Sequence, residues 1–136
     1  FLTCFFGDWS SKMEDRINSF EDLEAWKSAR ELVCNVYTTF RREPASRDYG
    51  LRDQVQRAAV STMTNIAEGF ERIHLQEKIQ FYNIARASCG EVRSLIYVMA
   101  DASYSTSEEQ KQLHDLTIRT GKLLSGLLQS TRARIK

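Results

Sequence analysis

The most informative stretch of the chain runs from Gln54 to Gly69 and reads QVQRAAVSTMTNIAEG. Its polar residues recur at steps of three, four, four and three, the period of one face of an α-helix. These residues are Gln54, Arg57, Ser61, Asn65 and Glu68. A neighbouring apolar line with the same period consists of Leu51, Val55, Ala58, Thr62 and Ile66. The stretch therefore predicts an amphipathic helix whose core stripe lies beside a polar face rich in hydrogen-bonding groups.

Two of the other segments also show a broad helical pattern. Residues 23–40 carry two adjacent apolar lines behind a capping box formed by Ser19 and Asp22. Pro44 ends this helix, because proline lacks an amide hydrogen and clashes with the preceding turn. Residues 75–103 place an apolar line beside a second, more polar one; the apolar line consists of Ile79, Tyr82, Cys89, Val92, Ile96 and Met99.

A fourth helix follows the overlapping caps Ser105 and Thr106. Its apolar residues have coiled-coil spacing and are Leu113, Leu116, Thr120, Leu123 and Leu127. Gly69 suits the left-handed C-cap of the second helix, and a turn near Arg72 joins that helix to the third. Since no segment alternates like a strand, we expect an all-α, up-and-down antiparallel four-helix bundle.

Length and composition indicate one soluble domain. The chain has 136 residues, of which 42% are hydrophobic and 27% are charged. Residues 1–12 are aromatic and glycine-punctuated, and Met13 looks like an original start, so we expect 1–12 to be a non-native or peripheral extension of a bundle domain at 13–136. No apolar run is long enough to span a membrane. Three widely spaced cysteines, without paired ligand spacing, favour a reducing, cytoplasmic setting.

The charges are balanced in number but not in position. The formal net charge is +1, so no global field indicates a nucleic-acid partner. From Leu116 onward every ionisable residue is basic, namely Arg119, Lys122, Arg132, Arg134 and Lys136. Bases near a helix end complement the helix dipole, which is the interpretation that we favour. A basic ligand-binding patch is the alternative.

The sequence offers little catalytic machinery. Glu71 and His74 have the Glu-x-x-His spacing of di-iron helical bundles, but such sites need a second copy of the motif. The only other histidine, His114, has Lys111 three residues before it. Nucleotide-binding glycine loops and nucleophile motifs are also missing. We therefore predict a non-enzyme with no catalytic residues, no metal and no cofactor.

The polar face of the second helix has two interpretations. A turn near Arg72 would bring Arg57 alongside Ser88 and Glu91, so an Arg57–Glu91 bridge inside the fold is expected. We favour a structural network over a surface that binds another molecule. The residues of this predicted network are Gln54, Arg57, Ser61, Asn65, Glu68 and Glu91.

Two stretches of the chain resemble a known family. One is Phe20-Glu21-Asp22-Leu23-Glu24-Ala25-Trp26, and the other runs from Tyr49-Gly50-Leu51 through Gln54, Arg57-Ala58-Ala59-Val60-Ser61 to Asn65-Ile66-Ala67-Glu68-Gly69. Together with Phe81, Ala85, Ser88 and Glu91, they resemble the four-helix bundle proteins encoded by intervening sequences of bacterial 23S rRNA genes. The resemblance covers about residues 20–130.

This resemblance implies a non-enzymatic bundle that assembles into a homopentameric ring. It also implies kinship with the accessory variability determinant of diversity-generating retroelements, a basic pentamer that binds a reverse transcriptase and nucleic acid. Assembly agrees with the two apolar lines of residues 23–40, which exceed what a small bundle covers. The present chain departs from the retroelement relative in being nearly neutral.

Two classes of function follow from these expectations. The first is an accessory factor associated with RNA or DNA, in which a ring repeats a few basic side chains. The candidate contacts are Arg41, Arg42, Arg47, Arg52, Arg132, Arg134 and Lys136. The second is an assembly module that docks a protein such as a reverse transcriptase. Salt separates the two, because phosphate contacts weaken steeply with salt and apolar interfaces do not.

Overall fold

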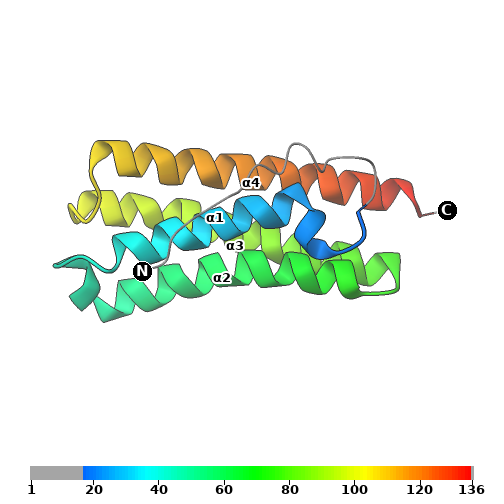
Figure 1. The fold of residues 1–136 in the computed structure, drawn as a ribbon, viewed down its shortest axis with the longest axis horizontal. Coiled ribbons are helices and arrows are strands. Elements are labelled where there is room, and N and C mark those ends of the chain that lie inside the picture. The colour runs from blue at the N-terminus through cyan, green and yellow to red at the C-terminus, as the bar shows by residue number, and fades with distance from the viewer. Residues whose placement is uncertain (1–16, 136) are drawn as a thin grey trace.

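The four long helices form an antiparallel up-and-down bundle (Figure 1). The computed structural model describes residues 17–135. The helices are α1 (Glu24–Thr39), α2 (Tyr49–Glu71), α3 (Leu75–Asp101) and α4 (Ser107–Ala133), and the short 3-10 helices η2 (Phe20–Asp22) and η3 (Ala45–Arg47) precede α1 and α2. Both α1 and α3 pack against α2 and α4. The predicted all-α bundle is confirmed, and residues 17–135 contain no strand.

The helix starts follow local capping chemistry. The Asp48 carboxylate accepts a hydrogen bond of 3.2 Å from the Leu51 N–H and caps α2. At α4, Thr106 and Glu109 form the predicted capping box, in which each side chain accepts from the other residue's N–H. The box at Ser19 is also present, but it caps η2, so α1 begins only at Glu24. The expected extension at residues 1–12 lies outside the described part of the chain.

The predicted C-cap at Gly69 is wrong. Helix α2 continues to Glu71, and Gly69 keeps a helical backbone. A Cβ at Gly69 would lie 2.6 Å from Tyr82 Cε1, so this glycine makes room for a buried ring of α3. The carbonyls at the end of α2 are satisfied by Lys78, whose Nζ donates to Phe70 O at 2.6 Å and to Gly69 O at 3.4 Å.

The core follows the predicted apolar lines, with one shift in α4. The α3 line is buried from Tyr82 to Met99. In α4 the buried line begins at Leu113 as expected, but then it passes through Leu124 and Leu128 and leaves Leu123 and Leu127 half-buried; its buried members are Leu113, Leu116, Thr117, Thr120, Leu124, Leu128 and Thr131. A straight helix has 3.6 residues per turn, so the side that faces the core drifts away from a coiled-coil line with its period of 3.5.

Helix α1 does not leave its apolar lines exposed, contrary to expectation. Its buried side chains belong to Ala25, Ser28, Ala29, Leu32, Val36 and Thr39, and Trp26, Val33 and Tyr37 are half-buried. Packing against both α2 and α4 covers the wide apolar arc. The exposed large hydrophobic side chains of residues 17–135 all lie outside α1, and three of them are Ile84, Tyr97 and Val98 of α3.

A few hydroxyl groups interrupt the core without remaining unsatisfied. Ser28 Oγ and Thr120 Oγ1 lie 2.7 Å apart, and both side chains are buried. The Cys89 thiol contacts Thr117 O at 3.3 Å, and burial raises its pKa to about 11, so it stays protonated at neutral pH. Among residues 17–135 every buried side-chain nitrogen and oxygen has a hydrogen-bond partner. No helix in that range is long and apolar enough to cross a membrane.

Candidate nucleic-acid interface

The predicted polar face of α2, called the polar stripe below, forms hydrogen bonds to α3 in its middle. Ser61 Oγ and Ser88 Oγ are 2.8 Å apart. Asn65 Nδ2 donates to Ser61 O at 2.8 Å and to Ser61 Oγ at 3.0 Å, so the amide orients the serine hydroxyl. Ser61 and Asn65 thus form hydrogen bonds within the fold, and Ser61 links α2 to α3.

The expected buried bridge between Arg57 and Glu91 is wrong. Both side chains are exposed, and no ion pair within 4.0 Å joins them in the described chain. Instead they line a hollow of about 480 Å³ between α2 and α3, together with Gln54, Ser61 and Ser88. Neighbouring residues of a helix point about 100° apart. Because Ala58 is buried, the preceding residue, Arg57, points to the solvated rim of the bundle.

The ends of the stripe are also solvated. Gln54 and Glu68 are exposed. The Glu68 carboxylate lies 3.9 Å from Arg72, which follows the last residue of α2, and Arg72 also lies 3.7 Å from Glu77. The stripe is thus divided into a structural middle and exposed ends.

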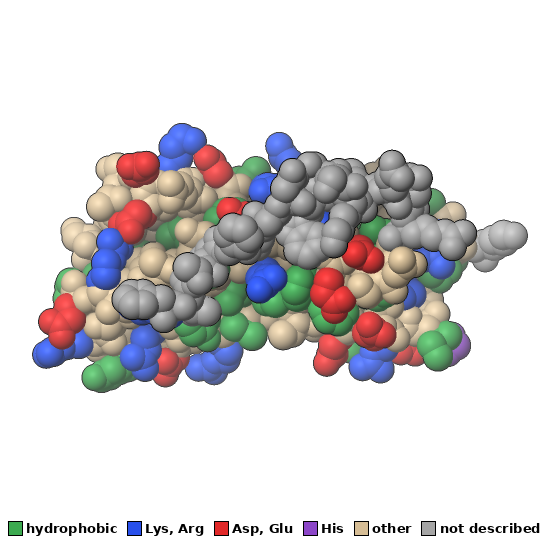
Figure 2. Space-filling model, in the orientation of Figure 1, with side chains coloured by type: hydrophobic (Ala, Val, Ile, Leu, Met, Phe, Trp, Pro, Cys, Tyr) green, Lys and Arg blue, Asp and Glu red, His purple; other side chains and the backbone are tan. Residues whose placement is uncertain are grey.

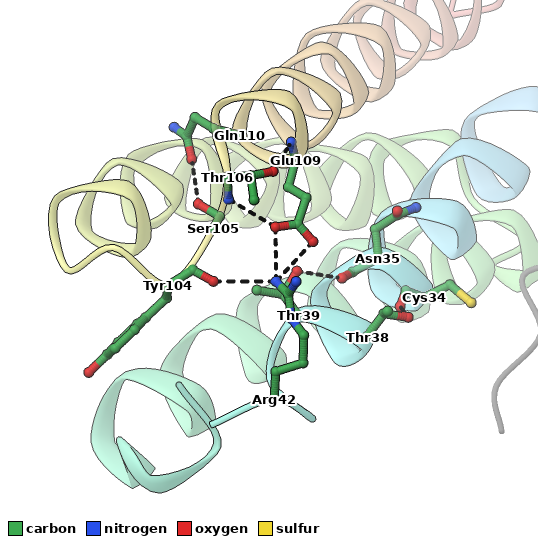
Figure 3. Close-up of polar contacts among 10 residues, drawn as sticks. All are labelled: Cys34, Asn35, Thr38, Thr39, Arg42, Tyr104, Ser105, Thr106, Glu109 and Gln110. Carbon is green, nitrogen blue, oxygen red and sulfur yellow. Dashed lines mark hydrogen bonds and ion pairs between the residues drawn. The ribbon is translucent and has the colours of Figure 1, made fainter. Parts of the chain in front are cut away.

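Most of the candidate cations near the first loop already have partners. Arg42 Nη2 lies 2.9 Å from the Glu109 carboxylate and 3.4 Å from Tyr104 O, so it joins the loop after α1 to the start of α4 (Figure 3). Arg47 pairs with Glu43 at 2.9 Å. Arg52 lies 3.4 Å from Asp53 and 4.8 Å above the Tyr49 ring. Of the four candidates, Arg41 is the one without an ion-pair partner in the described chain.

The basic residues at the end of α4 are different, because they are exposed and unpaired. Within residues 17–135 neither Arg132 nor Arg134 has an acidic partner within 4.0 Å; Lys136 lies outside that range. This end of α4 lies at the same end of the bundle as the α2–α3 turn (Figure 1). The pKa of Lys78 is lowered, mainly by burial and to a smaller extent by the positive charge of Arg134. The negative charge of Glu71 acts in the opposite direction.

A second hollow, between α3 and α4, was not predicted from the sequence. This α3–α4 groove has a volume of about 510 Å³. Its charged lining residues are Arg86 and Arg93 from α3 and Lys122 from α4, and no aspartate or glutamate lines it. Gly90, Gly121 and Gly126 also line the groove. These glycines are a signal that the sequence contains, because glycine in a helix interior is about 0.5–1 kcal/mol less stable than alanine and so needs another reason to be there.

Charges of both signs are interspersed on the face shown in Figure 2, where blue and red side chains lie side by side. Elsewhere along α4, cations pair with acids, such as Lys111 with Asp115 at 2.7 Å and Arg119 with Glu31 at 3.6 Å. A group of unpaired cations therefore differs from the rest of the surface because no acidic side chain lies beside it. It need not contain more basic residues than other parts of the surface.

The histidines form no metal site in the described chain. His74 is exposed at the N-cap of α3, and His114 is half-buried with its ring edge-on to Tyr97 at 6.2 Å. Residues 17–135 contain no group of three or more histidine, cysteine, aspartate or glutamate side chains that could hold a metal ion. The Glu-x-x-His spacing at Glu71 is therefore unaccompanied by further ligands.

The fold and its surfaces define a small four-helix bundle protein with exposed basic groups and with a polar seam between α2 and α3, formed by Ser61, Asn65 and Ser88. Residues 21–126 match the family of the 23S rRNA-intervening sequence protein, and the chain belongs to that family. A solved structure of a protein of unknown function from the S23 ribosomal protein family of Bacteroides thetaiotaomicron has a similar fold, with a TM-score of 0.71. The two chains are 17% identical over 76% of this chain and 97% of that one. No curated protein matches the sequence.

Proposed function

We propose that the protein is a non-enzymatic accessory factor that associates with RNA or DNA through exposed basic side chains. The observation that carries this proposal is the unpaired state of Arg132 and Arg134 at the end of α4. A guanidinium group without an acidic neighbour is available to a phosphate. The family description refers to an intervening sequence of 23S rRNA, which agrees with an RNA-associated role.

Assembly would strengthen such binding. Among the described residues, the end of α4 offers only two unpaired arginines, Arg132 and Arg134, so this end of a single copy would bind phosphate weakly. A homopentameric ring, as the family resemblance implies, would present the end of α4 five times, and a nucleic acid that engages several copies gains avidity. We place this assembly in the cytoplasm.

A salt series tests the proposal. The protein should bind a structured RNA in gel shifts at 50 mM salt and lose affinity steeply by about 200 mM, because phosphate contacts release counterions. Replacing Arg132, Arg134 and Lys136 by alanine should flatten this salt dependence and leave the melting temperature unchanged, since helix ends contribute little packing.

The matched control removes two α4 cations that already have acidic partners. Lys111→Ala with Arg119→Ala breaks pairs to Asp115 and Glu31. This variant should keep the parental salt dependence. Absence of RNA binding by the parent at 50 mM salt, with the assembly intact, would contradict the proposal.

A protein-interaction or assembly module is the second candidate. The exposed side chains of Ile84, Tyr97 and Val98 on α3 favour it, with exposed fractions of 44%, 55% and 46%. Side chains of this size on one helix suit contact with another copy or with a protein partner such as a reverse transcriptase. Binding that resists salt and is lost in Val98→Glu would support this alternative.

A further inference from the structure

The α3–α4 groove has a more uniform charge than the other hollow of similar size. Its three charged residues, Arg86, Arg93 and Lys122, are all cations. The α2–α3 hollow instead contains one arginine and one glutamate, Arg57 and Glu91. Two hollows on one bundle thus differ in the ligand that their charge would favour. The α2–α3 hollow has one charge of each sign and so favours neither anions nor cations. The α3–α4 groove has only positive charges and attracts anions.

The cations of the groove have no acidic partners. Within residues 17–135, Arg86, Arg93 and Lys122 form no ion pair within 4.0 Å. Two acids that contact α4 side chains are already engaged, since Asp115 pairs with Lys111 and Glu31 pairs with Arg119. Three like charges around one cavity repel one another, and an anionic ligand would relieve that repulsion.

The depth of the groove comes from glycines whose missing Cβ atoms would contact no other described residue. A Cβ at Gly90, Gly121 or Gly126 would meet nothing within 4 Å. Gly69 is the contrast, because there a Cβ would collide with Tyr82. Alanine would stabilise a helix interior better than glycine does. Open space above three helical glycines, between unpaired cations, therefore agrees with a surface shaped for a ligand.

We propose that the α3–α4 groove binds the phosphate backbone of a nucleic-acid strand, with Arg86, Arg93 and Lys122 contacting successive phosphates. Arg86 and Arg93 are seven residues apart, about 10 Å along α3. On α4 the lining residues Ser125 and Gln129 are followed by Arg132 at helical spacing. The row thus continues toward the unpaired end of α4, which favours an extended strand over a compact anion.

This inference rests on the proposed association with nucleic acid and assigns it a site. The test uses the full chain and a fluorescein-labelled single-stranded RNA of twelve or more nucleotides, titrated by anisotropy across a salt series. Arg86→Gln with Arg93→Gln should lower the affinity at least tenfold at low salt. It should also reduce the slope of log affinity against log salt by about 1.4, because each single-strand phosphate contact contributes about 0.7.

Two further variants separate charge from shape. Gly121→Leu keeps all three cations but fills the groove, so it should lower the affinity while the helical circular dichroism and melting temperature remain at least parental. Arg57→Gln is the matched control for charge, since it removes one exposed arginine from the mixed α2–α3 hollow. It should bind RNA like the parent.

Each remaining outcome overturns a defined part of the proposal. Parental binding by the Arg86/Arg93 variant, with binding lost when Arg132 and Arg134 are replaced, would refute the groove and leave the proposed function standing. Equal affinity for tripolyphosphate and for the long RNA would refute an extended strand. Equal affinity for a polyglutamate peptide would indicate an acidic protein instead. No RNA binding by the parent would refute both the groove and the proposed function.

Discussion

At the scale of single residues, the core combines close packing with a few hydroxyl groups that satisfy one another. Ser28 on α1 and Thr120 on α4 are the clearest pair, with 2.7 Å between their oxygens and almost no exposed surface. A buried hydroxyl that loses its partner carries the full cost of desolvation, whereas loss of both hydroxyls removes that cost. The pair therefore links two helices in a way that single substitutions should reveal.

We expect Ser28→Ala and Thr120→Val each to lower the free energy of unfolding by about 1–3 kcal/mol. The double variant should lose less than the sum of the two, because neither hydroxyl is then left alone. Urea unfolding of the four proteins of this cycle measures the coupling. Ser125→Ala, at an exposed position of α4, is the control and should change stability by no more than about 0.5 kcal/mol. Additive losses would contradict the coupling.

Gly69 and Gly50 provide a second test at this scale. Gly69→Ala brings a Cβ to 2.6 Å from Tyr82 Cε1, and the Tyr82 ring is 2% exposed and has little room to move. We expect a loss of about 1–3 kcal/mol from overpacking. Gly50→Ala meets nothing within 4 Å and should be neutral or stabilising by up to about 1 kcal/mol. Thermal melts measure the stability of both variants. Equal changes in melting temperature would contradict the close approach of α2 and α3.

At the scale of elements, periodicity predicts which helices form and which broad face is buried. The α3 line from Tyr82 to Met99 shows this, because apolar residues at helical spacing have one common side to bury. Periodicity fails where a face meets the rim of the bundle. Arg57 is adjacent to the buried Ala58, and the position of the neighbouring helix decides which of them meets water.

The glycines of the α3–α4 groove are visible in the sequence, but their position side by side is not, for a related reason. The groove depends on Gly90 of α3 and Gly121 of α4, which are far apart in the chain and lie together only because the helices pair antiparallel. A missing side chain has no periodic pattern of its own. The end of α2 was mispredicted because Lys78, near the start of α3, takes over the carbonyls that a C-cap would have satisfied.

The N-terminus of α4 gives a prediction about pH. Partial burial alone would raise the pKa of the Glu109 carboxyl, but hydrogen bonds from Arg42 and from the Thr106 N–H outweigh it and hold that pKa below its ordinary value of 4.5. A carboxyl with a lowered pKa in the folded state stabilises the protein above its unfolded pKa, and this contribution is lost as the pH falls through the folded pKa. Stability should therefore decline below about pH 4.5.

Glu109→Gln should flatten this acidic part of the stability profile, and Thr106→Ala should cost about 1 kcal/mol through loss of the cap. Urea unfolding from pH 3 to pH 7 measures both effects. Glu108→Gln is the matched control, because Glu108 is exposed and its side chain makes no hydrogen bond in the described chain. If Glu109→Gln keeps the parental acid dependence, the network of Arg42, Thr106 and Glu109 does not contribute to it.

At the scale of the whole molecule, the exposed large apolar side chains of residues 17–135 include three on α3 and none on α1. Within the bundle, one side of the α1 arc is buried, and Trp26, Val33 and Tyr37 are half-buried. Ile84, Tyr97 and Val98 remain exposed on α3. Because Ile84 and Val98 are fourteen residues apart, two heptads, they lie on nearly the same side of the helix. An interface between copies would therefore use this side of α3, beside the polar seam with α2.

We expect a homopentamer, with a mass of about five times 15.7 kDa in light scattering coupled to size exclusion. Ile84→Glu with Val98→Glu should dissociate it, because charges in the middle of an apolar contact cannot be solvated there. Ile73→Glu is the matched control, since Ile73 is the most exposed of these side chains, at 88%, and lies in the turn between α2 and α3. It should keep the parental mass. A monomer at micromolar concentration would contradict the ring, and a pentamer that survives both α3 substitutions would place its interface on another face.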